Sequence, residues 1–597
     1  MLHIFRQMKT RDRWLALLCL CLVCGQVYFD LKLPDYTAAI TVLISSEVTE
    51  MSEYWSAGLK MLGCALCSAG LTVIVGFFVA RIAADFSFDI RSLVFNKVTD
   101  FGSGDIKKFS TASLITRTTN DITQIQMIIA MGLQMMLRAP IMAIWAIIKI
   151  VGKSWQLSAV VAAAVLVVVI SLIILLAIMI PKFRIVQRQI DDVNRITEEN
   201  LNGIRVVRAF NAEKYQEDKF ETANDNLKRT QLFTGRGMAF LNPIMMFVQS
   251  AVTLGIYYVG AILINNIEIP MTDMTAMAAA ISDRSVMLGD VVSFSSYAMY
   301  VIMSFVMLLM IFMMLPRAQV SARRISEVID SDVAVTEGSE KTGSETGTIE
   351  FKNVSFHYPD ASEDCLKNIS FSAKKGETVA FIGATGSGKS TLAELAARLY
   401  DATSGEIRLD GRNISEYTFN TLYDKVGFVP QKAQLFSDTI KGNISFGDCG
   451  HEVTDRDVEE ALDIAQATDF VSEMDGGMDA RIAQGGTNVS GGQKQRLSIA
   501  RALARKPEIL ILDDTFSALD YKTDRILRQR LMQERKNMTC LIVAQRIGTI
   551  RNADKIVVLD DGAIVGMGTH DELMKSCPVY QEIALSQLSE DELAANA

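Results

Sequence analysis

The sequence predicts a two-part chain, in which an α-helical membrane domain with six spans precedes an α/β domain. The 597 residues are 50% hydrophobic and only 21% charged, and the mean hydropathy is +0.23. All apolar runs long enough to cross a bilayer, about 20 residues as helix, lie in the first half. From Ile349 onward, short apolar strands alternate with helical patterns, which is typical of an α/β domain.

The composition also excludes two classes of protein. So large an apolar share is incompatible with a disordered or collagen-like chain. The net charge is −9, whereas a nucleic-acid binder usually presents a basic face. We therefore expect no nucleic-acid partner, and a lipid bilayer around the first half.

The first predicted span, 14–29, is short, and we expect it to continue past Pro34 to about Ile44 as a kinked helix. Helices buried in a soluble core rarely run so long with so few charges, which favours membrane spans. Of the apolar windows themselves, only the third contains charges, Arg138 and Lys149. The other five spans are 61–80, 128–151, 157–180, 239–264 and 291–315.

Charges in the loops predict the orientation, because basic residues gather on the cytoplasmic side. Basic residues precede the first span and follow the second and fourth, and the alternate loops are mostly acidic. Both termini should be cytoplasmic, in a multi-pass protein of a plasma (inner, bacterial-type) membrane. The basic start resembles a signal peptide, but no A-x-A-like site follows it and five more spans do. The segments 81–127 and 181–238 should continue as helices about 30 Å into the cytosol.

Nine cysteines are present, and Cys64-x-x-Cys67 has a spacing found in metal sites. The pair lies within a predicted span and the chain has only four histidines, so helix packing is the better interpretation. No disulfides are expected in a reducing compartment. The polar segment 331–348 is typical of a linker. We therefore predict a membrane domain over 1–330, this linker, a soluble domain over 349–586 and a polar tail over 587–597.

The strongest motif follows a predicted strand, 378–382, and precedes a predicted helix, 391–400. It matches the P-loop pattern G-x-x-x-x-G-K-[ST], in which glycine-rich backbone N–H groups surround a phosphate at a helix N-terminus. Lys389 would bridge the β- and γ-phosphates, and Ser390 would ligate Mg²⁺. The loop residues expected to bind ATP are Gly383, Ala384, Thr385, Gly386, Ser387, Gly388, Lys389, Ser390 and Thr391.

Two further motifs follow the P-loop. An apolar strand, 509–512, ends in Asp513, the Walker B pattern whose carboxylate holds Mg²⁺ through water. Between the two lies the segment 489–493, Val-Ser-Gly-Gly-Gln. In this order the motifs resemble the ATP-binding cassette (ABC) family, whose signature reads LSGGQ. Six spans before one α/β P-loop nucleotide-binding domain (ABC type) resemble a half-transporter of the multidrug-resistance-like exporter group.

The resemblance implies further roles. Tyr358 would stack on adenine, and the Q-loop residue Gln431 would contact Mg²⁺ and sense the membrane domain. Coupling turns would lie near 111–117 and 210–217. The signature residues, which would contact ATP held by a partner subunit, are Ser490, Gly491, Gly492 and Gln493. The D-loop residues, which would contact the opposite subunit, are Ser517, Ala518, Leu519 and Asp520.

Two departures from the family pattern concern catalysis. The family has Glu after the Walker B aspartate to polarise the attacking water, but this chain has Asp514, one methylene shorter. A positioning error of about 1 Å can cost about 10²-fold in rate. The family's switch-loop histidine is replaced by Gln545, which cannot carry a proton or a positive charge. The candidate catalytic set is therefore Asp514, Gln545, Lys389 and Gln431. The segment 483–486 also lacks the family's usual Glu-Arg.

These departures imply a second half-transporter as partner, with an intact catalytic Glu and switch His. Neutral drift or an engineered hydrolysis-dead variant is an alternative, but two chemically degrading changes fit a natural degenerate site better. The chain would then be one subunit of a heterodimeric, ATP- and Mg²⁺-dependent exporter. It would move drug-like, lipid or other amphipathic substrates outward by alternating access.

Two alternative functions are a regulatory or channel-gating subunit without net pumping, and a homodimeric lipid or peptide exporter. Two features of the sequence bear on the substrate without identifying it. Methionines concentrated in the last span suit adaptable apolar binding or ordinary packing. Charges at membrane depth, such as Arg138, Lys149, Asp30 and Lys32, could line a pathway or form local ion pairs.

Overall fold

A computed structural model describes residues 4, 6–45, 51–269, 274–534 and 538–587. The chain divides into two compact units. One contains 1–96 and 115–330, and the other contains 97–114 and 331–597. The predicted polar tail, apart from Gln587, lies outside the described residues.

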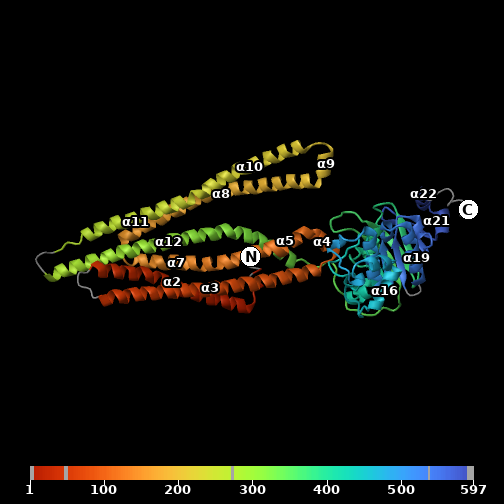
Figure 1. The fold of residues 1–597 in the computed structure, drawn as a ribbon, viewed down its shortest axis with the longest axis horizontal. Coiled ribbons are helices and arrows are strands. Elements are labelled where there is room, and N and C mark those ends of the chain that lie inside the picture. The colour runs from red at the N-terminus through yellow and green to blue at the C-terminus, as the bar shows by residue number, and fades with distance from the viewer. Residues whose placement is uncertain (1–3, 5, 46–50, 270–273, 535–537, 588–597) are drawn as a thin grey trace. The chain divides into compact units, whose positions relative to one another are not determined.

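The membrane unit confirms the six predicted spans, each on a helix long and apolar enough to cross a bilayer. The first helix runs through Pro34, as predicted. The third span joins three helices through π-helical turns at Arg117–Asp121 and Ile128–Gly132. The helices, visible in Figure 1, are α2 (Thr10–Ser45), α3 (Met51–Thr99), α5 (Thr111–Thr116), α6 (Ile122–Met127), α7 (Leu133–Val151), α8 (Trp155–Asn202), α9 (Ile204–Ala209), α10 (Glu213–Ala239), α11 (Leu241–Asn265) and α12 (Met274–Ile329).

The buried centre of the membrane unit lies where α12 packs against α2 and α7. Val27 on α2, Ala146 on α7 and Phe294 on α12 are fully buried there. Tyr297, also on α12, is fully buried too, and it brings a hydroxyl group into this apolar interior. A buried hydroxyl needs a hydrogen-bond partner, and its partners are on α2.

The predicted first coupling turn, 111–117, is misplaced. Those residues lie in α5 and the start of the π-helical turn, and the chain reverses before them, around the short helix α4 (Ser103–Phe109). Gly102 and Gly104 were the available sequence signal. Asp105 stabilises this turn, because its Oδ2 accepts hydrogen bonds from the backbone N–H groups of Gly102 and Ala334, each at 3.1 Å. The second turn follows α9, with Asn211 at φ 50°, and overlaps the prediction.

The other unit is an α/β domain, as predicted. Its six-stranded sheet has the order β10-β9-β3-β8-β7-β6 and is parallel except at β10. The strands are β3 (Thr378–Gly383), β6 (Val426–Val429), β7 (Ile509–Asp513), β8 (Thr539–Val543), β9 (Lys555–Asp560) and β10 (Ala563–Gly568). A second, antiparallel sheet has the order β2-β1-β4-β5 and comprises β1 (Ile349–Phe356), β2 (Leu366–Ala373), β4 (Ser404–Leu409) and β5 (Arg412–Asn413).

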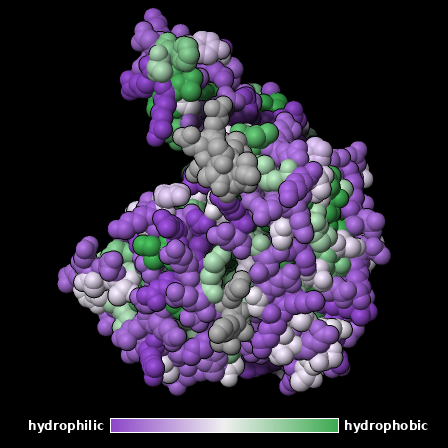
Figure 2. All heavy atoms as spheres, turned by 90° about the vertical axis from the view of Figure 1, so that its right-hand side faces the viewer, coloured by the Kyte–Doolittle hydropathy of each residue, from purple (hydrophilic) through white to green (hydrophobic). Residues whose placement is uncertain are grey.

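Successive residues of β3 belong to two different apolar cores. Ala380 and Ile382 pack in one core, and Val379 and Phe381 pack in the other. This alternation follows from the period of two along a strand and shows that both faces of the sheet are covered. The helices of this unit include α13 (Lys389–Ala396), α14 (Phe419–Lys425), α15 (Ile440–Ile444), α16 (Asp455–Ile464), α17 (Thr468–Glu473), α18 (Gly491–Ala504), α19 (Tyr521–Glu534), α21 (His570–Ser576) and α22 (Pro578–Gln587). The face of this unit in Figure 2 is mostly hydrophilic.

Candidate nucleotide site

The P-loop joins β3 to α13, and its shape depends on glycine. Gly386 and Gly388 have φ values of 87° and 93°, in the left-handed region that disfavours other residues. A Cβ atom on Gly388 would lie 2.6 Å from the Leu366 side chain. A Cβ on Gly383 would lie 2.0 Å from the Leu559 carbonyl oxygen. The loop therefore turns tightly onto the N-terminus of α13, where backbone N–H groups can receive a phosphate.

Lys389, the first residue of α13, is 9% exposed. Its ammonium group donates to the carbonyl oxygens of Gly383, at 2.9 Å, and Ala384, at 2.8 Å. Burial lowers the pKa of Lys389, while the carboxylates of Asp514 and Asp513 oppose that shift. The cation is thus held inside the loop where the phosphates are expected.

Ser390 and Asp513 lie together, as a shared Mg²⁺ ion requires. The Ser390 hydroxyl donates to Asp513 Oδ1 at 2.9 Å. Burial raises the pKa of Asp513, and the Ser390 hydrogen bond opposes that shift. Hydroxyl and carboxylate oxygens are the ligands that Mg²⁺ takes in phosphate sites, so the residues fit this cation.

Asp514, Gln431 and Gln545 converge on one point. Asp514 Oδ2 accepts hydrogen bonds from Gln545 Nε2 at 2.7 Å and from Gln431 Nε2 at 3.1 Å. Asp514 is 7% exposed and has a left-handed φ of 45°. The two residues that depart from the family pattern are therefore hydrogen-bonded to each other. Beside them lies a cavity of about 10 Å³ lined by Asp514, Gln545 and Ser517, close to the smallest space that holds a water molecule.

Tyr358 lies against the P-loop helix. Its hydroxyl is 2.9 Å from Thr391 Oγ1, and burial raises its pKa to about 12. Tyr400 meets its ring at a centroid distance of 5.5 Å, with the two planes nearly perpendicular. The Lys107 ammonium, on α4, lies 4.4 Å from the centre of the Tyr358 ring, in cation–π range. Sequence reasoning missed Lys107, because no motif surrounds it.

The signature residues form the N-terminus of α18. The Ser490 hydroxyl accepts from Gln493 N–H at 3.3 Å, and Gln493 Oε1 accepts from Ser490 N–H at 2.8 Å, which makes a capping box. Ser490 and Gly491 are exposed. A Cβ on Gly492 would lie 3.3 Å from the carbonyl oxygen of Ala518, so the D-loop packs against the signature.

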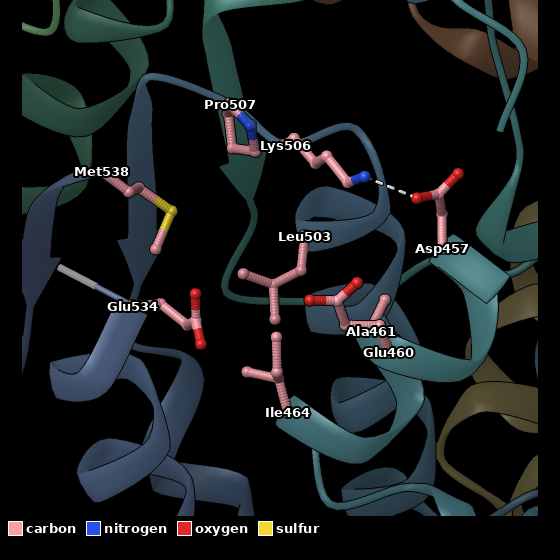
Figure 3. A pocket seen from close by; sticks show the side chains of 9 residues that line it. All are labelled: Asp457, Glu460, Ala461, Ile464, Leu503, Lys506, Pro507, Glu534 and Met538. Atoms are coloured by element: carbon pink, nitrogen blue, oxygen red, sulfur yellow. Dashed lines mark hydrogen bonds and ion pairs between the residues drawn. The ribbon is translucent and has the colours of Figure 1, made fainter. Parts of the chain in front are cut away.

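A larger cavity, of about 300 Å³, lies elsewhere in this unit and contains none of the predicted site residues. Figure 3 shows it beside α16, with the Lys506–Asp457 ion pair of 2.6 Å at its rim. Its lining residues are Asp457, Glu460, Ala461, Ile464, Leu503, Lys506, Pro507, Glu534 and Met538. Because the nucleotide motifs lie apart from it, this cavity is separate from the candidate site.

Comparisons with known proteins agree with this geometry. The family model described as "ABC transporter transmembrane region" matches residues 51–283, and "ABC transporter" matches 366–517. The uncharacterized ABC transporter ATP-binding protein Rv1273c of Mycobacterium tuberculosis is 36% identical over 538 residues, covering 89% of this chain and 88% of the relative. The corresponding YfiB protein of Bacillus subtilis is 34% identical over 542 residues, 91% of each chain.

Two other similar proteins have descriptive names. An ATP-dependent lipid A-core flippase of Photobacterium profundum is 30% identical over 546 residues, 90% of this chain and 88% of the relative. The solved structure of a bacterial Atm1-family ABC exporter with ATP bound has a TM-score of 0.76 at 22% identity. The superposition covers 97% of this chain and 99% of the exporter chain, so the two chains share a fold throughout.

Proposed function

This chain belongs to the ABC transporter family, as an exporter half-transporter that carries its membrane and nucleotide-binding domains on one polypeptide. From this premise we propose that it pairs with a different half-transporter, and that its own P-loop site binds ATP but cleaves it slowly. The partner supplies the second, fast site. Together the two subunits export an amphipathic substrate across the membrane.

The observation that carries the proposal is the hydrogen bonding of Asp514. A general base needs a free lone pair within reach of the attacking water. One carboxylate oxygen of Asp514 already accepts from the amides of Gln431 and Gln545. The amide of Gln545 is directed at this carboxylate, and unlike a histidine it cannot become cationic beside the γ-phosphate. The Glu-to-Asp and His-to-Gln changes thus weaken hydrolysis together.

ATP binding depends on other residues than hydrolysis does, and the chain has the residues that binding requires. Lys389 supplies a buried cation, and the N-terminus of α13 supplies oriented N–H groups. Ser390 and Asp513 would hold Mg²⁺, which when bound neutralises charge on the β- and γ-phosphates. We therefore expect this site to retain ATP and to act mainly as a clamp.

The signature is expected to serve the other site. Ser490 and Gly491 are exposed at the start of α18, where they can reach a nucleotide held by a second subunit. The segment Ser490–Gln493 keeps the family's SGGQ. The intact signature of this chain would complete the partner's active site, which requires the catalytic Glu and switch His that this chain lacks.

Steady-state Mg-ATP turnover tests the proposal. The full-length chain is purified alone in a non-ionic detergent, and again with the half-transporter that co-purifies with it. We expect the lone chain to turn over ATP at least about tenfold more slowly than the two-subunit complex, given the usual value of a positioned base. Lys389→Ala in the lone chain provides the background rate. Turnover by the lone chain at the rate of the complex would overturn the proposal.

A further inference from the structure

Among the described residues, three ion pairs join α7, or the connection that follows it, to other helices of the membrane unit. The pairs are Asp30–Arg138 at 2.9 Å, Asp35–Lys149 at 2.9 Å and Asp290–Lys153 at 2.7 Å. The first two join α2 to α7, and the third joins the α7–α8 connection to α12. The membrane-depth charges Arg138 and Lys149 therefore pair with α2, where Pro34 separates Asp30 from Asp35.

Stability does not explain the Asp30–Arg138 pair. The side chain of Asp30 is 10% exposed and that of Arg138 is 27% exposed. Removing two charges from water costs several kcal/mol per ion, and a buried pair often recovers no more than this. Ionisable residues within membrane spans are rare and usually mark a pathway or a binding site.

Among the described residues near Asp30, one buried hydrogen-bond acceptor has no donor. The Ser68 hydroxyl donates to Asp30. Gln26 lies one helical turn before Asp30 on the same face of α2 and is 1% exposed. Its Oε1 has no hydrogen-bond partner among the described residues. An orphaned buried acceptor is costly, so a ligand that donates here would be stabilised.

The guanidinium group of Arg138 can also donate further hydrogen bonds. It donates to Asp30 through one terminal nitrogen. Within the described part of the chain, no other hydrogen bond is recorded for its guanidinium group. A guanidinium fork matches a phosphate or carboxylate in a bidentate arrangement. The site thus offers donors for an oxyanion beside acceptors, Asp30 and Gln26, for an ammonium group.

We propose that the Asp30–Arg138 pair and Gln26 form a binding site for the zwitterionic headgroup of an amphipathic substrate. The pair balances one carboxylate against one cation, so a ligand with net charge would leave one of these two ions uncompensated at low dielectric. A zwitterion instead exchanges partners, with its anion on Arg138 and its ammonium on Asp30 and Gln26. This inference deepens the proposed export function and depends on it only for transport.

The neighbouring Asp35 is more fully engaged and so serves for comparison. Tyr297 Oη is 2.5 Å from Asp35 Oδ1 and 3.1 Å from the Leu31 carbonyl oxygen, and Lys149 donates to Asp35 Oδ2. These contacts surround Pro34, whose ring interrupts the hydrogen bonds of α2. We assign this second pair a structural role in supporting the helix at the proline.

Equilibrium binding to the full-length chain in dodecyl maltoside tests the headgroup site without any need for ATP turnover. Four probes are titrated: dodecylphosphoethanolamine, dodecylammonium, dodecyl phosphate and tail-less phosphoethanolamine. Wherever a probe has an ammonium group, that group carries N–H donors for Gln26. The wild-type chain should bind dodecylphosphoethanolamine at least about tenfold more tightly than the other three. Arg138→Gln should reverse this preference towards the cationic probe, because Asp30 is then uncompensated. Asp30→Asn should shift it towards dodecyl phosphate.

Lys219→Gln is the matched control, because it breaks an exposed α10–α8 ion pair of 2.8 Å outside the site. It should leave all four affinities unchanged. The double variant Asp30→Asn/Arg138→Gln keeps the site neutral and guards against misfolding of the single variants. It should lose the zwitterion preference by about tenfold. The site would be overturned if the variants fold but bind the four probes with wild-type ratios. It would also be overturned if the wild-type chain bound tail-less phosphoethanolamine as tightly as dodecylphosphoethanolamine. A fast lone-chain ATPase would overturn only the proposed function.

Discussion

At the scale of single residues, the central feature is that one oxygen of Asp514 accepts two amide groups. The three residues come from the Q-loop, the end of β7 and the segment after β8. Gln431 lies 83 positions before Asp514, and Gln545 lies 31 positions after it. Each is held by the end of a parallel strand, and parallel strands bring such ends to one edge of the sheet. Changing these side chains should alter hydrolysis without altering the fold.

Restoring the family's residues should raise the hydrolysis rate. In Asp514→Glu/Gln545→His, the carboxylate extends by one methylene towards the water, and the histidine can donate to the γ-phosphate and carry charge. We expect lone-chain Mg-ATP turnover to rise by about 10²-fold, within the range of general-base catalysis. Single-turnover hydrolysis measures this. Asp514→Glu alone should raise the rate less, because the Gln545 amide would still donate a hydrogen bond to the carboxylate. An unchanged rate in the double variant would contradict the roles given to both residues.

Lys107 should tune nucleotide affinity through Tyr358. The hydroxyl of Tyr358 is held beside Thr391, and the Lys107 ammonium lies over the Tyr358 ring, where adenine would stack. A partly exposed cation–π contact is worth about 0.5–1 kcal/mol. If adenine competes for this face, Lys107→Gln should tighten ATP binding about threefold in a fluorescent-nucleotide titration.

The adjacent lysine supplies the control for that experiment. Lys108 lies over Phe109 of its own helix, at 5.7 Å from the ring centre. Lys108→Gln removes the same charge from α4 and should leave ATP affinity unchanged. Equal shifts in the two variants would indicate a general effect of charge and would exclude competition at Tyr358.

The residues of the candidate site were predictable to different degrees. The P-loop, Walker B and signature residues are contiguous in sequence, so their spacing alone identified them. The contact of Gln545 with Asp514 was not predictable, because it depends on where the neighbouring strands β7 and β8 end in the folded sheet. Lys107 was missed for the same reason, since it lies 251 positions before Tyr358 and carries no motif of its own.

At the scale of secondary-structure elements, α16 and α18 begin with the same kind of N-terminal cap. In α18 Ser490 Oγ accepts from Gln493 N–H, and in α16 Thr454 Oγ1 accepts from Asp457 N–H, both at 3.3 Å. Both helices have a complete capping box. The two caps should therefore contribute similarly to stability, although only one belongs to the signature.

This pair of caps separates stability from function. Ser490→Ala and Thr454→Ala should each lower the free energy of unfolding by about 1 kcal/mol. Ser490→Ala alone should also slow ATP turnover of the two-subunit complex, by about tenfold, because its hydroxyl is proposed to contact the partner's nucleotide. Denaturant unfolding and ATPase assays on the two variants measure the two effects. Similar turnover in both would show that Ser490 acts only as a helix cap.

Elements were predicted best where the bilayer constrains them. A span must be helical and apolar over about 20 residues, so hydropathy identified all six. The first turn was predicted from the family resemblance, which placed it after α4, whereas the chain turns at α4 beside Gly102 and Gly104. The π-helical turns at Arg117–Asp121 and Ile128–Gly132 escaped prediction, since one inserted residue in a helix leaves no clear trace in an apolar sequence.

At the scale of the whole molecule, the proposal makes the transporter functionally asymmetric. In the proposed heterodimer, this chain would hold one nucleotide at its P-loop and would help to cleave another through its signature. Conformational cycling then requires hydrolysis at one site only, while ATP at the other keeps the two nucleotide-binding domains together. This division of roles predicts unequal effects when the same chemistry is removed from each subunit.

Equivalent substitutions in the two subunits test that asymmetry. In the co-purified complex, Asp514→Asn removes a carboxylate that accepts two amide hydrogen bonds and is proposed to be a poor base, so turnover should fall by no more than about twofold. Replacing the partner's catalytic Glu with Gln should lower turnover by about 10²-fold or more, since it removes a working base. Steady-state ATPase assays and retention of radiolabelled ATP on this chain check both effects. Equal losses from the two substitutions would mean that both sites hydrolyse ATP, and the hydrogen bonds around Asp514 would then be a resting arrangement that opens during each cycle.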